Sequence, residues 1–115
     1  MTKKKINIAI VGLGNIGSYL YLYLKKNISE LEKKTNVIPN IMFVSAKNRG
    51  KKRKFKVPNA IWEKNFLKIT KNKKVDIVVE LIGGAEGAAK KLVFESLNNG
   101  KHVVTANKAL VAKYG

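Results

Sequence analysis

INIAIVGLGNIG, residues 6–17, sets the architecture expected for this chain. Its first half, Ile6 to Val11, is short, almost entirely apolar and rich in β-branched side chains, which is typical of a buried strand. Three glycines follow in the spacing GxGxxG. Apolar side chains then recur at helical spacing and predict a helix to about Asn27: Ile16, Leu20, Tyr23 and Leu24.

Each glycine of this motif has its own expected task. Gly12 allows a tight turn out of the strand, Gly14 lets the backbone approach a pyrophosphate, and Gly17 lets the helix pack closely on the sheet. The pyrophosphate then lies at the helix N-terminus, where unpaired N–H groups and the helix dipole favour negative charge. Because the motif follows a strand and opens an amphipathic helix, it indicates dinucleotide binding. The alternative is a glycine turn that serves only packing.

Further apolar runs predict three more strands, at residues 41–45, 75–81 and 102–105. The polar residues 28–40 between the first helix and the next strand are expected to be irregular, with Pro39 and Asn40 as breakers. Residues 60–72 are expected to form a short strand or helix, with buried candidates Trp62, Phe66 and Ile69.

A helix is expected over residues 86–98, with Gly100 beside its C-cap and with four inward side chains: Ala89, Leu92, Val93 and Leu97. Another helix begins at Asn107. Strands that alternate with helices predict a Rossmann-type, doubly wound α/β fold, in which helices cover both faces of a mostly parallel sheet. A length of 115 residues allows one such domain.

Composition excludes several classes of function. The chain has no cysteine and a single histidine, His102, so we expect no metal site and no thiol chemistry. No apolar run approaches the roughly 20 residues that span a bilayer, and the basic N-terminus lacks the pattern of a signal peptide, so a cytoplasmic protein without a membrane partner is expected.

The net charge of +17 admits a remote alternative, a basic nucleic-acid-binding module. The basic residues, however, are nearly all lysines scattered along the chain, as a general compositional bias would leave them. The aromatic residues Tyr19, Tyr21 and Tyr23 lie within a helical segment. We therefore expect no nucleic-acid partner.

The loop after the second strand bears on the choice between NAD and NADP. NAD-binding folds usually place Asp or Glu there to bind the ribose 2′-hydroxyl, but no acidic residue lies between Glu32 and Glu63. Lys47 or Arg49 would instead attract a 2′-phosphate through a charge-assisted hydrogen bond of roughly 1.5–3 kcal/mol. NADP(H) is thus expected over NAD(H), although a solvated lysine loop is the alternative.

Three segments should meet at the carboxyl ends of the strands, where open α/β sheets bind ligands: 12–17, Ile82-Gly83-Gly84, and 105–108. Gly83 and Gly84 leave room for a nicotinamide ribose, or else form a plain loop. Lys108 lies in the first turn of a helix, where the dipole disfavours a second positive charge and so favours proton exchange with a substrate. The alternative is an ordinary surface lysine.

Two further residues have expected roles near these segments. Glu80 ends a buried strand and is a candidate for ordering the glycine loop, and His102 is expected to be structural rather than catalytic.

Three segments in this order resemble the N-terminal, NAD(P)-binding part of homoserine dehydrogenase: IVGLGNIG at 10–17, VVELIGG at 78–84, and GKHVVTANKAL at 100–110. The resemblance implies hydride transfer between aspartate 4-semialdehyde and homoserine, in the pathway to threonine, methionine and isoleucine. It implies cofactor contacts at Leu13, Asn15, Ile16, Lys47, Ile82, Gly83, Gly84 and Thr105, and an active-site role for Lys108 of the TANK segment, beside Asn107.

The same resemblance implies a homodimer in the full-length protein and a substrate domain beyond residue 115, with a second lysine, an acidic residue and a metal-ion site. Residues 1–115 would then be an incomplete domain without activity of its own. One departure is Lys47-Asn48-Arg49, where many family members have an Arg-Asp pair. The alternative within enzymes is the NAD(P)-binding domain of another amino-acid or sugar dehydrogenase.

Overall fold

A computed structural model describes residues 4–47, 55–82 and 87–105. These residues form a four-stranded parallel sheet in the order β2-β1-β3-β4. The strands are β1 (Lys4–Val11), β2 (Val37–Ser45), β3 (Ile77–Glu80) and β4 (His102–Thr105). The helices are α1 (Asn15–Thr35), α2 (Phe66–Lys71) and α3 (Ala88–Asn98), with a short 3-10 helix, η1 (Asn59–Ile61).

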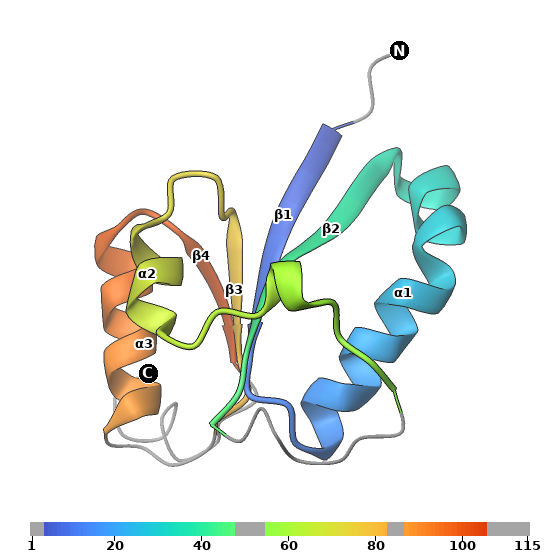
Figure 1. The fold of residues 1–115 in the computed structure, drawn as a ribbon. Coiled ribbons are helices and arrows are strands. Elements are labelled where there is room, and N and C mark those ends of the chain that lie inside the picture. The colour runs from blue at the N-terminus through green and yellow to red at the C-terminus, as the bar shows by residue number, and fades with distance from the viewer. Residues whose placement is uncertain (1–3, 48–54, 83–86, 106–115) are drawn as a thin grey trace.

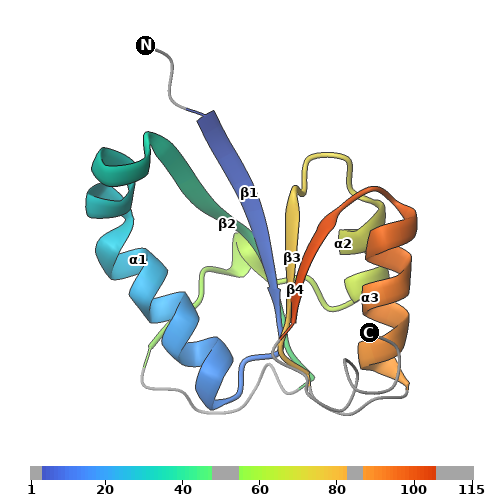
Figure 2. The same cartoon turned by 180° about the vertical axis from the view of Figure 1, so that it is seen from behind.

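Helices cover both faces of this sheet. α1 lies against one face, and α2 and α3 lie against the other (Figure 1), as the view from behind also shows (Figure 2). The expected α/β fold with a doubly wound parallel sheet is therefore confirmed.

The core divides into two layers because successive side chains of a strand point to opposite faces. Ala9 and Val11 of β1 are buried on the side of α2 and α3, against Ile69 and Leu92. Ile10 is buried on the opposite side, in a cluster that also contains Leu13, Tyr21, Ile41 and Val44. β1 is thus apolar on both faces, as the central strand of a parallel sheet has to be.

The expectation for residues 28–40 was wrong. α1 continues to Thr35 because Leu24, Ile28 and Leu31 keep the helical spacing, and it ends at Asn36, whose left-handed φ of 59° lets its N–H donate to the Glu32 carbonyl. β2 then begins at Val37 and includes Pro39. Proline lacks an N–H donor, and β2 tolerates it because this strand lies at the edge of the sheet.

Three smaller expectations concern α3, residues 60–72 and Gly100. Ala89, Leu92 and Val93 face the core as predicted, but Leu97 is 53% exposed, because Ser96 takes the next inward position of α3. The helical alternative for residues 60–72 is correct for α2, in which Ile69 is fully buried, whereas Trp62 and Phe66 are only half-buried. Gly100 follows α3 with a φ of 75°, as its expected place beside the C-cap requires.

Within the described residues, no helix combines the length and apolar character needed to cross a membrane.

Candidate functional site

The strands that follow β1 in the sequence lie on opposite sides of it, and this makes the carboxyl end of β1 the natural place for a ligand. β2 pairs with one edge of β1 and β3 pairs with the other, so the strand order reverses between β1 and β3. In open α/β sheets, ligands bind in the crevice outside such a switch point. The three strand ends are joined by backbone hydrogen bonds: Gly12 N–H donates to the Ser45 carbonyl (2.8 Å), and Leu81 N–H donates to the Val11 carbonyl (2.9 Å).

The glycine turn between β1 and α1 is tight for steric reasons. Gly12 has a φ of 108°, and a β-carbon there would lie 2.6 Å from the carbonyl carbon and oxygen of Leu81. A β-carbon on Gly17 would overlap the carbonyl oxygen of Gly12 and would also meet a methyl group of Leu81 at 3.5 Å. The predicted packing tasks of Gly12 and Gly17 are therefore consistent with this geometry.

Gly14 differs from the other two glycines. Among the described residues, no atom apart from those of its two chain neighbours lies within 4 Å of the position of a β-carbon on Gly14, and the residue is exposed. None of the described residues fills the space beside the turn, and its occupation by a pyrophosphate remains a prediction.

The N-terminus of α1 begins at this turn and presents its first backbone N–H groups there. Gly14 is the N-cap and offers no side-chain hydrogen bond, and no acidic residue lies in the first turn. The first N–H groups of a helix have no acceptor within the helix, so the partial positive charge here suits an anion. The side chains of Asn15 and Ile16 are exposed, whereas the side chain of Leu13 is buried in the core, which leaves its backbone for any contact.

Glu80 joins the ends of β3 and β4. It is fully buried, and its Oε1 accepts a hydrogen bond from Ile82 N–H (2.7 Å), while its Oε2 accepts one from the Thr105 hydroxyl (2.6 Å). The expectation that Glu80 orders the glycine loop stays a prediction, because the bond to Ile82 reaches only the last described residue before Gly83 and Gly84. The bond to Thr105 was not foreseen, because the sequence does not reveal that β3 and β4 align these two residues as cross-strand neighbours.

The remaining predicted contacts are placed in part. Lys47 is exposed just beyond the carboxyl end of β2. Ile82 follows the carboxyl end of β3, and Thr105 is the last residue of β4, so all three lie at the carboxyl ends of the strands. The other predicted site residues lie outside the described part of the chain: Arg49, Gly83, Gly84, Asn107 and Lys108.

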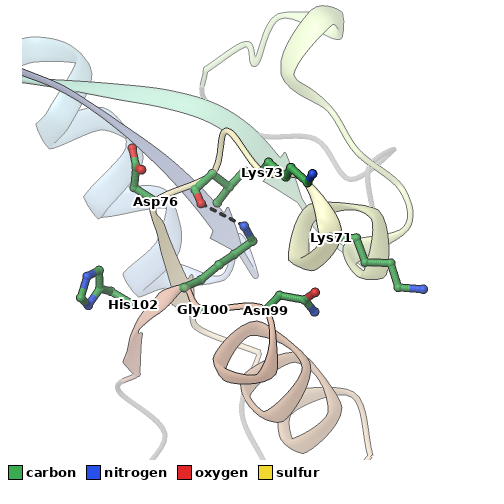
Figure 3. A pocket seen from close by; sticks show the side chains of 8 residues that line it. Lys71, Lys73, Asp76, Asn99, Gly100 and His102 are labelled. Carbon is green, nitrogen blue, oxygen red and sulfur yellow. Dashed lines mark hydrogen bonds between the residues drawn. The ribbon is translucent and has the colours of Figure 1, made fainter.

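A hollow of about 400 Å³ lies at the other end of the strands from the glycine turn, at the amino-terminal ends of β3 and β4 (Figure 3). Its lining comes from the connections before these strands and includes Lys71, Lys73, Asp76, Lys101 and His102. His102 is exposed there, far along the strand from Thr105. This hollow is therefore separate from the ligand-binding edge.

Lys101 beside this hollow is a buried lysine that the sequence analysis missed. Its Nζ donates to the carbonyl oxygens of Asn72 (2.5 Å) and Val75 (3.0 Å). Burial lowers the pKa of Lys101, and the negative charge of Asp76 opposes this shift. The amine thus closes the turn before β3. Among the described residues, no cluster of His, Asp and Glu side chains could hold a metal ion.

Comparison with known proteins points to one family. Residues 12–115 match the family model described as "Homoserine dehydrogenase, NAD binding domain". The chain is 38% identical to the homoserine dehydrogenase of Neisseria gonorrhoeae and 34% identical to that of Bacillus subtilis, over 112 residues in each case. These alignments cover 97% of this chain but only 25% and 26% of the two relatives, so the chain spans about a quarter of their length.

Solved structures agree with the sequence relatives. Staphylococcus aureus homoserine dehydrogenase at pH 7.5 superposes with a TM-score of 0.85 at 31% identity, over 93% of this chain and 27% of that one. The homoserine dehydrogenase of Thiobacillus denitrificans gives a TM-score of 0.82 at 34% identity, over 97% of this chain and 26% of that one. The chain belongs to the homoserine dehydrogenase family and corresponds to the NAD-binding domain of its members.

Proposed function

We propose that this chain is the cofactor-binding domain of an enzyme that interconverts aspartate 4-semialdehyde and homoserine by hydride transfer, in the route to threonine, methionine and isoleucine. The observation that carries the proposal is the open N-terminus of α1 beside Gly14, at the point where the strand order reverses. In this proposal the rest of the enzyme, including the substrate domain, follows residue 115. The intact protein is a cytoplasmic homodimer, and residues 1–115 alone have no activity.

The residues of the site fit a nicotinamide dinucleotide. The backbone N–H groups of Asn15, Ile16 and Gly17 bind the diphosphate, and the missing side chain of Gly14 lets it approach. Ile82 and Thr105 line the path toward the nicotinamide half, together with Gly83, Gly84 and Asn107. When bound, the nicotinamide ring exchanges the hydride with the substrate.

Proton transfer is assigned to Lys108. The substrate oxygen gains negative charge as hydride arrives at the aldehyde carbon, and a lysine beside it donates the proton that gives the alcohol. In the reverse direction, the same amine accepts that proton. A second lysine from the substrate domain shares this task.

NADP(H) is the proposed preferred cofactor, with NAD(H) as a weaker alternative. Lys47 lies at the end of β2, where the adenine ribose of a bound dinucleotide comes close. Lys47 and Arg49 together supply positive charge for a 2′-phosphate. A preference for NADPH over NADH of about tenfold or more is expected from one charge-assisted hydrogen bond.

The test uses the full-length protein that carries this chain. Steady-state rates are measured with homoserine and with a panel of other amino-acid and sugar alcohols, each with NADP⁺ and NAD⁺. The proposal expects homoserine to be the best substrate. Turnover of another alcohol without homoserine oxidation would assign the protein to another dehydrogenase activity, and equal affinity for NADPH and NADH would contradict the cofactor preference.

A further inference from the structure

Three backbone segments meet at the carboxyl end of β3, and the side chain of Glu80 binds two of them. Glu80 is the only buried acidic side chain among the described residues. Its Oε1 accepts from Ile82 N–H at 2.7 Å, and its Oε2 accepts from the Thr105 hydroxyl at 2.6 Å. The third segment is the glycine turn, since a β-carbon on Gly12 would lie 3.0 Å from the Ile82 nitrogen. Glu80 thus holds the end of β4 to the peptide group on which the glycine turn packs.

The order of the strands determines which half of a dinucleotide these segments would meet. β2, with Lys47 just beyond its end, lies on one side of β1, and β3 and β4 lie on the other. In the proposed function the diphosphate lies at the turn between β1 and α1, and the adenine ribose lies at the end of β2. The nicotinamide half then extends over the ends of β3 and β4, which are the two segments that Glu80 binds.

We infer that Glu80 is a positioning residue, which holds Ile82 and Thr105 in place relative to the glycine turn and so aligns the site of the nicotinamide half with that of the diphosphate. The inference rests on the proposed function and requires no contact between Glu80 and the cofactor. A site that is held in its binding geometry before the ligand arrives loses less conformational freedom on binding, which raises affinity. Because both donors bind one planar carboxylate, neither strand end moves without the other.

The site of the diphosphate is held without Glu80. Gly12 N–H donates to the Ser45 carbonyl at 2.8 Å, and Gly17 packs directly on the carbonyl group of Gly12. These contacts are made by the backbone alone. Loss of the Glu80 carboxylate should therefore weaken the binding of the nicotinamide half and spare that of the diphosphate half.

The test compares NADPH with 2′-phospho-ADP, which ends at the diphosphate and lacks the whole nicotinamide half. Dissociation constants of both ligands are measured with the full-length protein. Wild type should bind NADPH more tightly by about tenfold, the equivalent of roughly one hydrogen bond. Glu80→Met, which has a similar length but no oxygen acceptor, should lower this ratio by about fivefold to tenfold, while the dissociation constant of 2′-phospho-ADP stays within about twofold of wild type.

A matched control separates positioning from a general loss of stability. Glu30→Met makes the same chemical change at an exposed position in the second half of α1, far from the glycine turn, and should leave both dissociation constants unchanged. A Glu80 with only a structural role would weaken both ligands equally or neither. The ratio of Glu80→Met would then equal that of wild type, and this result would overturn the inference.

Variants of Thr105 test the same link from its other partner. Thr105→Val removes the hydroxyl that binds Glu80 and keeps the shape of the side chain, so the ratio should fall, whereas Thr105→Ser should retain it. In the Glu80→Met background, Thr105→Val should change the ratio no further, because the two side chains act as one unit. Effects that add in the double variant would show that Thr105 acts without Glu80 and would contradict the inference.

The inference and the proposed function fail in different ways. A wild-type protein that binds both ligands equally overturns the inference alone, because homoserine oxidation tests the proposed function separately. A wild-type protein that binds neither ligand overturns the proposed function and, with it, the inference. If Glu80→Met does not fold, a Thr105→Val variant that keeps the wild-type ratio is sufficient to reject the inference.

Discussion

The carbonyl oxygen of Gly12 occupies the place that a β-carbon on Gly17 would need. Gly12 is itself held against the backbone of Leu81 and has a φ of 108°, so its carbonyl group cannot easily turn away. The turn that opens the ligand-binding edge is thus fixed by backbone contacts on two sides. Gly14, between these two glycines, has no such neighbour within the described part of the chain.

Gly17→Ala should destabilise the fold and abolish cofactor binding. The new methyl group meets a backbone atom that has no room to move, so the cost should reach about 3 kcal/mol, the upper part of the range for overpacking. Denaturant unfolding and cofactor titration of the full-length protein measure the two effects. A variant as stable as wild type would show that the turn relaxes more easily than this geometry implies.

Gly14→Ala should separate binding from stability. Gly14 has a φ of −77°, which alanine adopts freely, and its β-carbon would meet no atom of the described residues beyond its chain neighbours. Loss of stability should stay at about 1 kcal/mol, the usual cost of replacing a good N-cap residue by alanine. Affinity for the dinucleotide should fall about tenfold or more, because the methyl group takes the space of the diphosphate. Unchanged affinity would mean that the diphosphate does not approach Gly14.

The fold could be predicted where a local pattern carries the information. The run from Ile6 to Val11 and the glycines after it identify strand, turn and helix within one short segment. The last turns of α1, residues 28–35, were not predicted because lysines and glutamates surround Ile28 and Leu31, and Pro39 suggested a break. Pro39 is compatible with β2 only because that strand lies at an edge, and strand order is a property of the whole sheet.

In the candidate site, too, local sequence predicts some features, whereas others depend on the assembled sheet. The motif identifies the turn at residues 12–17, and the lack of acidic residues after β2 points to Lys47. The hydrogen bond between Glu80 and Thr105 depends on the register of β3 with β4, and the burial of Lys101 depends on carbonyl groups that lie 26 and 29 residues earlier in the chain. Such contacts follow from the assembled sheet and have no signature in the local sequence.

Lys101→Met should destabilise the fold at neutral pH. The substitution leaves the carbonyl groups of Asn72 and Val75 without the amine that binds them, which should cost about 1–3 kcal/mol. Lys73→Met is the matched control, because Lys73 lines the same hollow but is exposed, and its effect should stay within about 0.5 kcal/mol. Denaturant unfolding measures both, and equal effects would argue against a structural role for the Lys101 amine.

The pH dependence of stability should also report on Lys101. Burial lowers the pKa of this amine from its ordinary value of 10.5, against the opposing effect of Asp76. Between the lowered pKa and 10.5 the unfolded chain binds more protons at this position than the folded chain. The contribution of Lys101 to stability therefore rises with pH through that window. The difference in the free energy of unfolding between wild type and Lys101→Met should therefore grow in favour of wild type as the pH approaches 10.5. A difference that stays constant or shrinks would contradict the lowered pKa.

Lys47→Glu should reverse the cofactor preference. The substitution replaces a charge that attracts a 2′-phosphate by one that repels it, at the end of β2. Loss of one charge-assisted hydrogen bond alone corresponds to roughly 1.5–3 kcal/mol, which is about one to two decades in the ratio of the NADPH and NADH affinities. Lys5→Glu makes the same change of charge at the opposite end of the sheet, in the amino-terminal part of β1. Several residues of extended strand separate Lys5 from the site, and this distance exceeds the Debye length of about 8 Å at physiological salt. The ratio of NADPH to NADH affinity of Lys5→Glu should therefore equal that of wild type. Titrations with NADPH and NADH decide the matter: if the two variants behave alike, the charge of the whole chain and not Lys47 sets the preference.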